Sequence, residues 1–307
     1  MKKEFTYLSA DGITNIHAIE WKPEGEIKAI LQIAHGMVEF IDRYDEFASY
    51  LCEKGYLVIG NDHLGHGLSV KDSTCYGYFH ETRGNECVIA DIHRLRILTQ
   101  KVYKDIPYFV LGHSMGSFLM RQYIEIYGEG LNGAIIMGTG EQSPVVVGAG
   151  KTLCKIIAMF KGWKHRSALV DNMAFGSYNK AFEPARTDKD WLTKEEKVVD
   201  AYLANPWNTF RFTVNGYYHM FRGMMYASKK EHIQQIPKDL PLFLVAGDKD
   251  PVGENGKAVK KVYETYKACQ LKDVRIKLYE NDRHEILNET DRATVFEDIW
   301  MWLEEKR

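Results

Sequence analysis

A serine stands between two glycines in the stretch VLGHSMGS, residues 110–117. Gly112, Ser114 and Gly116 have the G-x-S-x-G spacing of a nucleophile elbow, a sharp turn after a strand that exposes the serine hydroxyl. The plainer alternative is a glycine-rich turn whose serine only caps a helix. Because a serine hydroxyl is a weak nucleophile, chemistry here requires a base, an acid that orients the base, and an oxyanion hole.

Candidates for the acid and the base come later in the chain. The segment GDKDPVG supplies Asp248 and Asp250, and YENDRHEILNE supplies His284 after the next apolar run. A lone loop histidine, or a turn aspartate beside Pro251, would mean little by itself. The order serine, aspartate, histidine, each after its own predicted strand, favours a catalytic triad. Asp250 is preferred because it stands later in its loop, although the residues alone leave Asp248 open.

An oxyanion hole needs two backbone N–H groups aimed at a developing negative charge. The residue after the nucleophile, Met115, is expected to supply one of them. The segment HGMVEF, residues 35–40, follows the third apolar run and is expected to supply the other. Gly36 permits a turn there, so Met37 is the predicted second donor. A simple turn would explain Gly36 but not its position in the chain.

Short apolar runs that alternate with helical patterns must position these residues. KEFTYL and NIHAIEW flank a hairpin signal at Asp11-Gly12. Six further runs read as strands: AILQIAHG, YLVIGND, YFVLGHS, GAIIMGTG, PLFLVAGDKD and VRIKLYEN. Segments with helical periodicity separate most of them. This alternation predicts an α/β protein with a mainly parallel sheet covered by helices on both faces.

Residues 141–235 break the alternation and are predominantly helical in pattern. We call them the cap segment. Their place between two predicted strands indicates an insertion outside the sheet, with 1–140 and 236–307 forming one core domain. Ligands of such sheets bind beyond the carboxyl ends of the strands. A helical insertion that leaves from such an end is therefore expected to cover the site as a lid.

Charge is divided unevenly between the two parts. The whole chain has a formal net charge of −2, which gives no reason to expect nucleic acid as a partner. The cap segment has 14 Lys or Arg and 9 Asp or Glu, leaving 26 and 33 for the core. A basic cap suits an anionic lipid, an anionic substrate or a bilayer surface. Simple solvation of surface lysines is the alternative.

Large apolar side chains are concentrated in the cap segment. VVVGAGKTLCKIIAMF covers residues 145–160, and YYHMFRGMMY covers residues 217–226. Methionine and aromatic side chains form adaptable apolar walls that fit an acyl chain or an aromatic acid. The alternative is that they pack the cap onto the core. Helices this apolar could also contact a membrane or a second subunit as a homo-oligomer.

The cysteines and the N-terminus indicate a compartment. Five cysteines are scattered along the chain without a C-x-x-C pair, which favours reduced thiols over a metal site. The N-terminal MKKEFTYLSADG lacks the apolar stretch of a signal peptide. We therefore expect a cytoplasmic protein. The triad chemistry requires no metal and no organic cofactor.

The chain resembles the α/β-hydrolase family of monoacylglycerol lipases and lysophospholipases, the serine aminopeptidase-like group. The matching motifs are HGMVEF with the following RY, DHLGHGLS, GHSMGS, GDKDPVG and RHEILNE, between residues 35 and 289. The resemblance implies an α/β-hydrolase fold with an eight-stranded sheet, flanking helices and an inserted helical cap. It implies Ser114 as nucleophile, Asp250 as acid and His284 as base. It also implies an oxyanion hole from Met37 and Met115.

The resemblance extends to substrate-binding positions. Gly36, Glu39, Arg43 and His113 are expected near the polar end of the pocket, although Glu39 and Arg43 could equally form a buried ion pair that braces the oxyanion loop. Phe40 stands where the family pattern often has a histidine, which should make that end less polar. DHLGHGLS resembles a structural loop of the family, so its Asp62, His63 and His66 are not expected to be catalytic.

These features predict a serine carboxylic-ester hydrolase. Its expected substrate is a small acyl ester such as a monoacylglycerol or a lysophospholipid, cleaved through an acyl-enzyme. An aminopeptidase or amidase of the same family is the alternative, although a basic cap suits a substrate ammonium poorly. A weakly catalytic ligand-binding α/β-hydrolase is a further alternative; such proteins often lack a triad member, and none is missing here.

Overall fold

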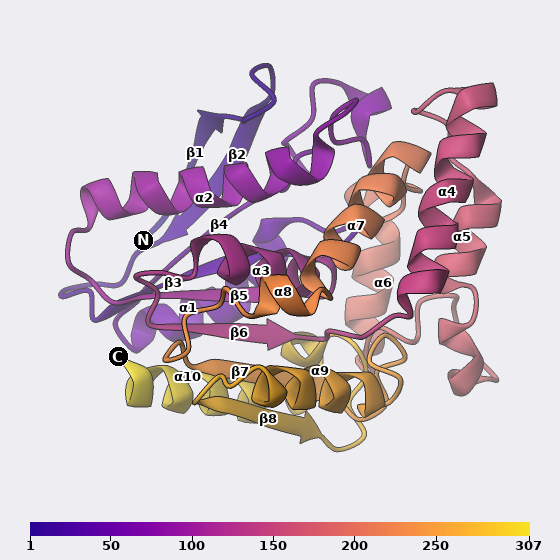
Figure 1. Cartoon of the computed structure of the whole chain (residues 1–307). Helices are drawn as coiled ribbons and strands as arrows, with labels where there is room; N and C mark the ends of the chain where they lie inside the picture. The colour runs from indigo at the N-terminus through magenta and orange to yellow at the C-terminus, as the bar shows by residue number, and fades with distance from the viewer.

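Eight apolar runs form one sheet in the computed structural model, which describes all residues 1–307 (Figure 1). The strands are β1 Lys2–Leu8, β2 Asn15–Trp21, β3 Ala29–Ala34, β4 Tyr56–Asn61, β5 Tyr108–His113, β6 Gly133–Met137, β7 Leu242–Gly247 and β8 Val274–Tyr279. Their order is β1-β2-β4-β3-β5-β6-β7-β8. Only the β1–β2 and β2–β4 pairs are antiparallel. The predicted mainly parallel eight-stranded α/β sheet is confirmed.

Helices cover both faces of the sheet. They are α1 Asp45–Glu53, α2 Gly84–Val102, α3 Met115–Tyr127, α9 Lys257–Ala268 and α10 Arg292–Lys306. One core cluster joins α2, α3 and α9 to one face, and another joins α1 and α10 to the other. Neighbouring side chains of β5 belong to opposite clusters, Val110 to the first and Leu111 to the second. Successive side chains of a strand point to opposite faces of the sheet, and here both faces are buried. The strand sequences are therefore apolar at consecutive positions.

Five helices of the cap segment come between β6 and β7 in the chain. The first four extend beyond the carboxyl ends of the strands, and the short fifth helix lies beside α3 (Figure 1). They are α4 Pro144–Lys161, α5 Ala168–Phe175, α6 Glu196–Ala204, α7 Val214–Ala227 and α8 Lys230–Ile233. Short 3-10 helices occur at Ile41–Tyr44, Ser73–Cys75, Tyr178–Phe182, Pro206–Asn208 and Ile286–Asn288. No helix combines the length and apolarity needed to cross a bilayer.

Candidate active site

Ser114 occupies the tight turn between β5 and α3. Its φ of 54° and ψ of −119° are strained for a residue with a side chain. The flanking glycines permit this turn. A Cβ on Gly112 would lie 2.2 Å from the carbonyl oxygen of Gly116, and one on Gly116 would lie 2.0 Å from that of Ala34. No side chain fits at either position, so the G-x-S-x-G spacing is a packing requirement that raises the serine above the sheet.

The loops after β7 and β8 bring an aspartate and a histidine together. The Nδ1 atom of His284 lies 2.9 Å from Oδ1 of Asp250, and both side chains are buried. The same carboxylate oxygen accepts the Val252 amide. Asp248 points elsewhere and accepts the Asn281 amide at 2.8 Å. The structure therefore pairs Asp250, and not Asp248, with the histidine. Ser114 Oγ makes no hydrogen bond to His284 in this arrangement, but the two residues line one pocket.

The two expected oxyanion donors lie beside Ser114. Met115 is the first residue of α3, and its N–H has no partner within the helix. Met37 lines both pockets that contain Ser114. A Cβ on Gly36 would lie 3.0 Å from Ser114 Cβ, so the loop after β3 passes directly against the nucleophile. The amides of Met37 and Met115 therefore stay the predicted donors to a substrate oxygen.

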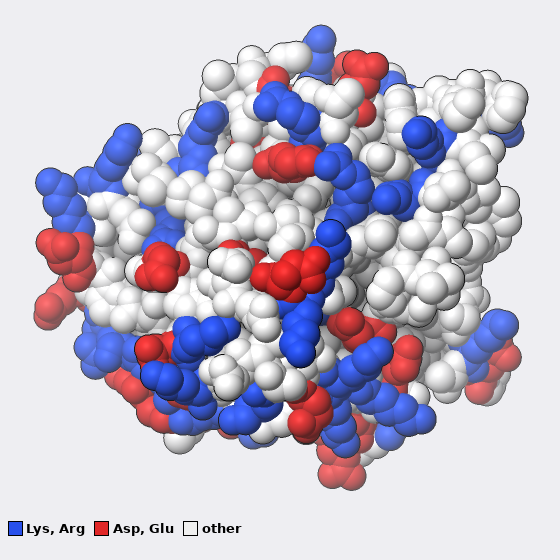
Figure 2. All heavy atoms as spheres, in the orientation of Figure 1, with Lys and Arg blue, Asp and Glu red and all other residues white.

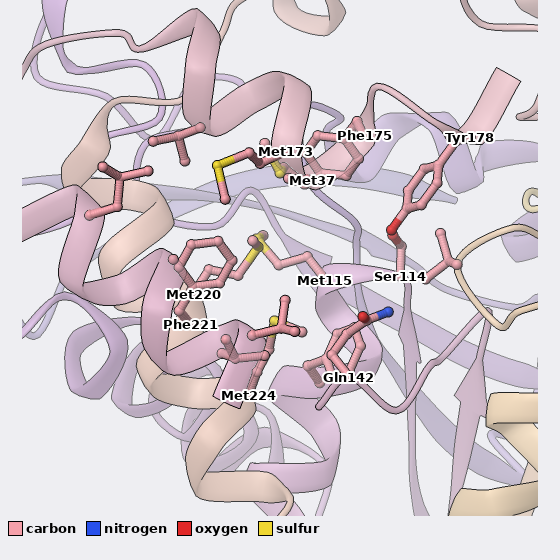
Figure 3. A pocket seen from close by; sticks show the side chains of 18 residues that line it. Met37, Ser114, Met115, Gln142, Met173, Phe175, Tyr178, Met220, Phe221 and Met224 are labelled. Carbon is pink, nitrogen blue, oxygen red and sulfur yellow. The ribbon is translucent and has the colours of Figure 1, made fainter. Parts of the chain in front are cut away.

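An apolar pocket extends from Ser114 into the cap segment (Figure 3). Fifteen of its 18 lining residues are hydrophobic. Helix α3 supplies Met115 and Phe118 to its lining, while α4, α5 and α7 supply most of the other walls. The labelled lining residues are Met37, Ser114, Met115, Gln142, Met173, Phe175, Tyr178, Met220, Phe221 and Met224. Such a pocket suits an apolar chain.

A second, more polar pocket meets the first at Ser114. Only 8 of its 20 lining residues are hydrophobic. Three of the expected substrate-binding residues line it: Gly36, Glu39 and His113. Its cations are paired, because Arg211 lies 3.3 Å from Asp171 and Lys189 lies 3.7 Å from Asp188. Phe40 does not line either pocket and packs edge-on against Trp207.

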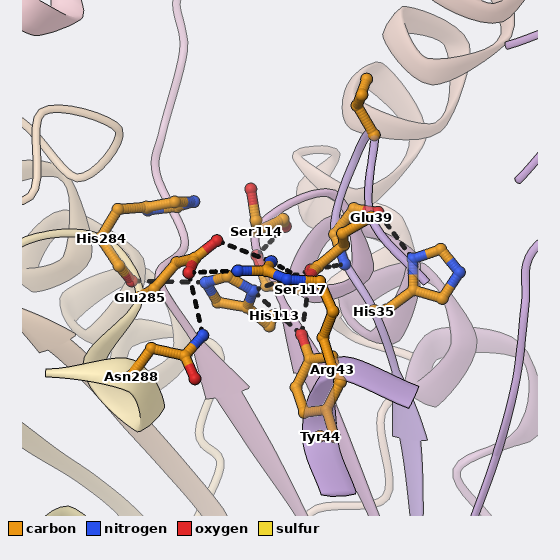
Figure 4. A network of polar contacts seen from close by, with 12 residues as sticks. His35, Glu39, Arg43, Tyr44, His113, Ser114, Ser117, His284, Glu285 and Asn288 are labelled. Carbon is orange, nitrogen blue, oxygen red and sulfur yellow. Dashed lines mark hydrogen bonds and ion pairs between the residues drawn. The ribbon is translucent and has the colours of Figure 1, made fainter. Parts of the chain in front are cut away.

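Arg43 lies behind the pocket as part of a buried cluster (Figure 4). Its guanidinium bonds Glu39 at 2.7 Å and holds Glu285 through two bonds of 2.8 and 2.7 Å. Glu39 also accepts the Gly36 amide. We call residues 35–40, which follow β3, the oxyanion loop. The cluster thus links the oxyanion loop to the loop after β8 that carries His284. Of the two interpretations of Glu39 and Arg43, this geometry favours the bracing ion pair.

The charges in this cluster stabilise one another. Burial opposes ionisation of Glu39, but the His113 hydrogen bond and the Arg43 charge hold its pKa well below its usual range. Burial also opposes ionisation of Glu285, and the Arg43 charge outweighs it and lowers the pKa. Both carboxylates are therefore charged at neutral pH.

Two cap side chains hold the oxyanion loop. Tyr202 Oη and Asn208 Nδ2 each donate to the Val38 carbonyl oxygen at 3.1 Å. Val38 has a φ of 56°, an unfavourable value for a β-branched residue. The ring of Tyr202 also lies 5.0 Å from the Arg43 guanidinium. The cap is therefore part of the support for the Met37 peptide as well as a cover.

Trp191 and Glu285 were not among the predicted site residues. The Trp191 ring centroid lies 5.1 Å from that of His284, so the indole packs against the imidazole. Glu285 directly follows the predicted base, and this position beside His284 was the signal available in the sequence. Trp191 offered no comparable signal, because its contact depends on how the cap folds over the core.

The loop DHLGHGLS has a structural role. Asp62 accepts the amides of Ile41 and Leu68 at 2.8 and 2.9 Å and pairs with His17. His63 and His66 are buried and line neither pocket. Burial lowers the pKa of both imidazoles, and of His66 to about 3. The placement agrees with the expectation that none of the three is catalytic.

A family model of the serine aminopeptidase S33 type matches residues 25–291. The chain belongs to this family. It is 24% identical over 310 residues to a monoacylglycerol lipase of Mycolicibacterium smegmatis, covering 98% of this chain and 97% of that one. It is 25% identical to the human monoglyceride lipase, covering 93% and 86%. These relatives and the fold identify the protein as a serine hydrolase of the α/β-hydrolase fold.

Solved structures repeat the whole architecture. A thermostable carboxyl esterase of Bacillus coagulans, crystallised with glycerol, superposes with a TM-score of 0.92 and 29% identity, covering 99% of this chain and 98% of that one. A lipase in an open form superposes with a TM-score of 0.89 and 26% identity, covering 100% and 99%. Both similarities extend over the cap segment as well as the sheet.

Proposed function

We propose that the protein hydrolyses carboxylic esters that join an acyl chain to a small neutral alcohol, such as a monoacylglycerol. The observation that carries this proposal is the position of Ser114 at the junction of two unlike pockets. An ester carbonyl at the serine would place its acyl chain in the apolar pocket and its alcohol in the polar one. The esterase and lipase names of the relatives support the same bond class.

The proposed reaction proceeds through an acyl-enzyme. Ser114 Oγ attacks the ester carbonyl carbon while His284 takes the serine proton, and Asp250 holds the imidazole in orientation. The Met37 and Met115 amides donate to the oxyanion. Collapse expels the alcohol, which receives the proton from His284. Water then attacks the acyl-enzyme and gives a proton to His284, which passes it to Ser114 Oγ as the acid is released.

The pairing of charges in the polar pocket favours a neutral alcohol. Arg211 and Lys189 each have an acidic partner at the pocket wall, so neither is free to hold a phosphate. The carboxylates are likewise occupied, Glu39 and Glu285 by Arg43. An aminopeptidase would need an unpaired carboxylate for the substrate ammonium. These pairs therefore favour monoacylglycerol over lysophospholipid and over amide substrates.

A chain-length series of acyl esters tests the proposal. We expect wild-type turnover of long-chain monoacylglycerol to exceed turnover of the matching lysophospholipid and of an acyl arylamide. Ser114→Ala should lower kcat by at least about 10³-fold, because the nucleophile is lost. Ser143→Ala, which changes an exposed serine before α4, is the matched control and should retain full activity. Undiminished hydrolysis by Ser114→Ala would contradict the assignment.

We further propose that the cap segment, residues 141–235, is a lid domain that docks on an anionic lipid surface. Residues 142–170 contain no Asp or Glu and five Lys or Arg. In Figure 2 the surface over α4 and α5, at the right edge, is largely uncharged with basic side chains beside it. Its exposed apolar residues, which we call the outer cap face, are Val145, Val146, Ile156, Met159, Phe160, Leu169 and Met173.

The outer cap face is continuous with the apolar pocket. Val146 and Met173 are 61% and 60% exposed, and both also line the pocket that ends at Ser114. An acyl chain leaving a lipid layer beneath this face would thus remain in apolar contact on its way to the serine. The lysines of α4 form no ion pair, so their charge is free for lipid headgroups.

Sedimentation with vesicles tests the docking. We expect binding to phosphatidylglycerol vesicles that weakens with added salt, and little binding to phosphatidylcholine vesicles. Met159→Gln with Phe160→Gln should lower the affinity about 10-fold or more, since these side chains are 73% and 82% exposed. Met301→Gln, on α10 and 58% exposed, is the control. A dimer that buries the outer cap face in solution would overturn the proposal in favour of a homo-oligomer.

The five cysteines are free thiols in the structure. This state supports the proposal of a reducing compartment such as the cytoplasm.

A further inference from the structure

His113 precedes the nucleophile and lies between two oxygen-rich loops (Figure 4). Its Nδ1 atom faces Oε1 of Glu39 at 3.2 Å and the hydroxyl of Tyr44 at 3.1 Å. Its Nε2 atom faces the carbonyl oxygen of His284 at 3.3 Å. Both ring nitrogens of a buried imidazole therefore point at acceptors that belong to opposite sides of the site.

Neither neutral tautomer donates from both ring nitrogens, and each turns one ring lone pair toward an oxygen of the site. A proton on Nε2 alone directs the Nδ1 lone pair at the Glu39 carboxylate. A proton on Nδ1 alone directs the Nε2 lone pair at the His284 carbonyl oxygen. Tyr44 has one hydroxyl proton, and its 3.0 Å bond to Glu39 uses that proton. Only the doubly protonated ring donates to every acceptor around it.

The charge balance of the buried cluster also favours a doubly protonated His113. Glu39 and Glu285 are buried carboxylates, and Arg43 supplies a single positive charge between them. With a neutral His113 the cluster would hold one uncompensated negative charge away from water, which is strongly unfavourable. A protonated His113 makes the cluster neutral.

We propose that His113 is a protonated imidazolium across neutral pH, and that it completes a charge-neutral cluster joining the oxyanion loop to the His284 loop. It is a positioning residue. Its ring centroid lies 4.8 Å from that of His284, and its Nε2–H holds the His284 carbonyl. Through Glu39 it also fixes the Gly36 amide and thereby the Met37 peptide.

Burial opposes the charge on His113, but the hydrogen bond and charge of Glu39 outweigh it and raise the pKa. The charged and titratable groups that face the ring are Glu39, Arg43 and Tyr44 on one side and His284 and Glu285 on the other. Since folding raises this pKa, the proton stabilises the folded state fully below about pH 6.5. That contribution is lost as the pH rises through the folded value.

The first test is a long-range ¹H–¹⁵N spectrum of the full-length protein labelled at histidine nitrogens. An imidazolium has two nearly equivalent nitrogen shifts, whereas a neutral ring has two distinct ones. His113→Asn assigns the resonance. We expect an imidazolium pattern for His113 at neutral pH. A neutral pattern at neutral pH would overturn the proposal.

Glu39→Gln provides the second test, because it removes one buried negative charge. We expect the His113 resonance to become that of a neutral ring near neutral pH. An unchanged imidazolium in this variant would contradict the charge-balance argument. Should His113→Asn not yield folded protein, His113→Gln assigns the resonance instead. Both spectral tests are independent of the proposed ester hydrolysis, so they can fail or succeed separately from it.

The kinetic readout rests on the proposed function. In His113→Asn we expect kcat for ester hydrolysis to fall about 10- to 100-fold with KM changed less than about 3-fold, because oxyanion contacts tighten in the transition state. The double variant Glu39→Gln with His113→Asn restores neutrality. The double variant should melt at a higher temperature than His113→Asn alone. If its melting temperature instead falls by the sum of the decreases in the two single variants, the charge pairing of Glu39 with His113 is contradicted.

Discussion

At the scale of single residues, the base of the site is held from three sides. Asp250 bonds one ring nitrogen of His284, His113 holds its carbonyl oxygen, and Trp191 packs against its ring. Trp191 is only 9% exposed and lines the polar pocket. Its indole thus limits both the tilt of the imidazole and the space left for the alcohol.

Removing the Trp191 indole should lower kcat more than it weakens the binding of the acyl chain. We expect Trp191→Ala to lower kcat about 10- to 100-fold and Trp191→Phe to retain most of it, measured with a short-chain ester well below the melting temperature. Trp207→Ala is the control, because Trp207 is another cap tryptophan and contacts Phe40 instead of His284. If kcat falls equally in Trp191→Ala and Trp207→Ala, the loss comes from a general disturbance of the cap and not from the contact with His284.

The sequence carried more information about the candidate reacting groups than about the residues that support them. Ser114, Asp250 and His284 stand in motifs whose spacing has a mechanical cause, and the structure brings the last two together. Whether Arg43 contacts substrate or braces a loop could not be decided from sequence. Its partner Glu285 is 242 positions away, and only the folded loops place the two within hydrogen-bonding distance.

At the scale of elements, the site depends on how closely α3 approaches β3. A Cβ on Gly116 would lie 2.0 Å from the Ala34 carbonyl oxygen, a backbone atom that cannot move aside. We expect Gly116→Ala to lower the free energy of unfolding by about 1–3 kcal/mol or more, measured by urea denaturation. It should also slow labelling of Ser114 by a fluorophosphonate, because the elbow must shift.

Gly148 supplies the matched control. It lies within α4, and a Cβ there would meet no atom within 4 Å. Gly148→Ala should therefore raise the stability by about 0.5–1 kcal/mol through helix propensity, with labelling unchanged. Similar losses in both variants would show that the tight contact at Gly116 is not what the turn requires.

Element types and order were predictable because parallel strands buried on both faces have continuous apolar sequences. The run Ala29–Ala34 is buried at every position. The cap helices were predictable as helices but not in arrangement. Their packing is set by contacts with distant loops, such as Tyr202 and Asn208 on Val38, and local periodicity carries no information about those partners.

At the scale of the whole molecule, two parts of the cap segment are attached to the core by different kinds of contact. The segment before α6 is tied to the core by polar contacts. Glu285 N donates to the Leu192 carbonyl oxygen at 2.7 Å, and Lys194 lies 2.7 Å from Asp282. Arg283 bonds the Asp190 carbonyl oxygen. By contrast, the side chains of α4 form no hydrogen bond or ion pair with the core, so α4 is held by apolar packing alone.

This contrast predicts which part of the cap segment opens more readily. We expect hydrogen exchange of backbone amides to be faster in α4 and α5 than in α6, because local opening of α4 breaks no polar contact with the core. Phosphatidylglycerol vesicles should slow exchange in α4 and α5 only, since the outer cap face would then be covered. Phosphatidylcholine vesicles are the control. Uniform exchange across the cap would mean that it moves as one body, and the Val38 contacts would then open together with the apolar pocket.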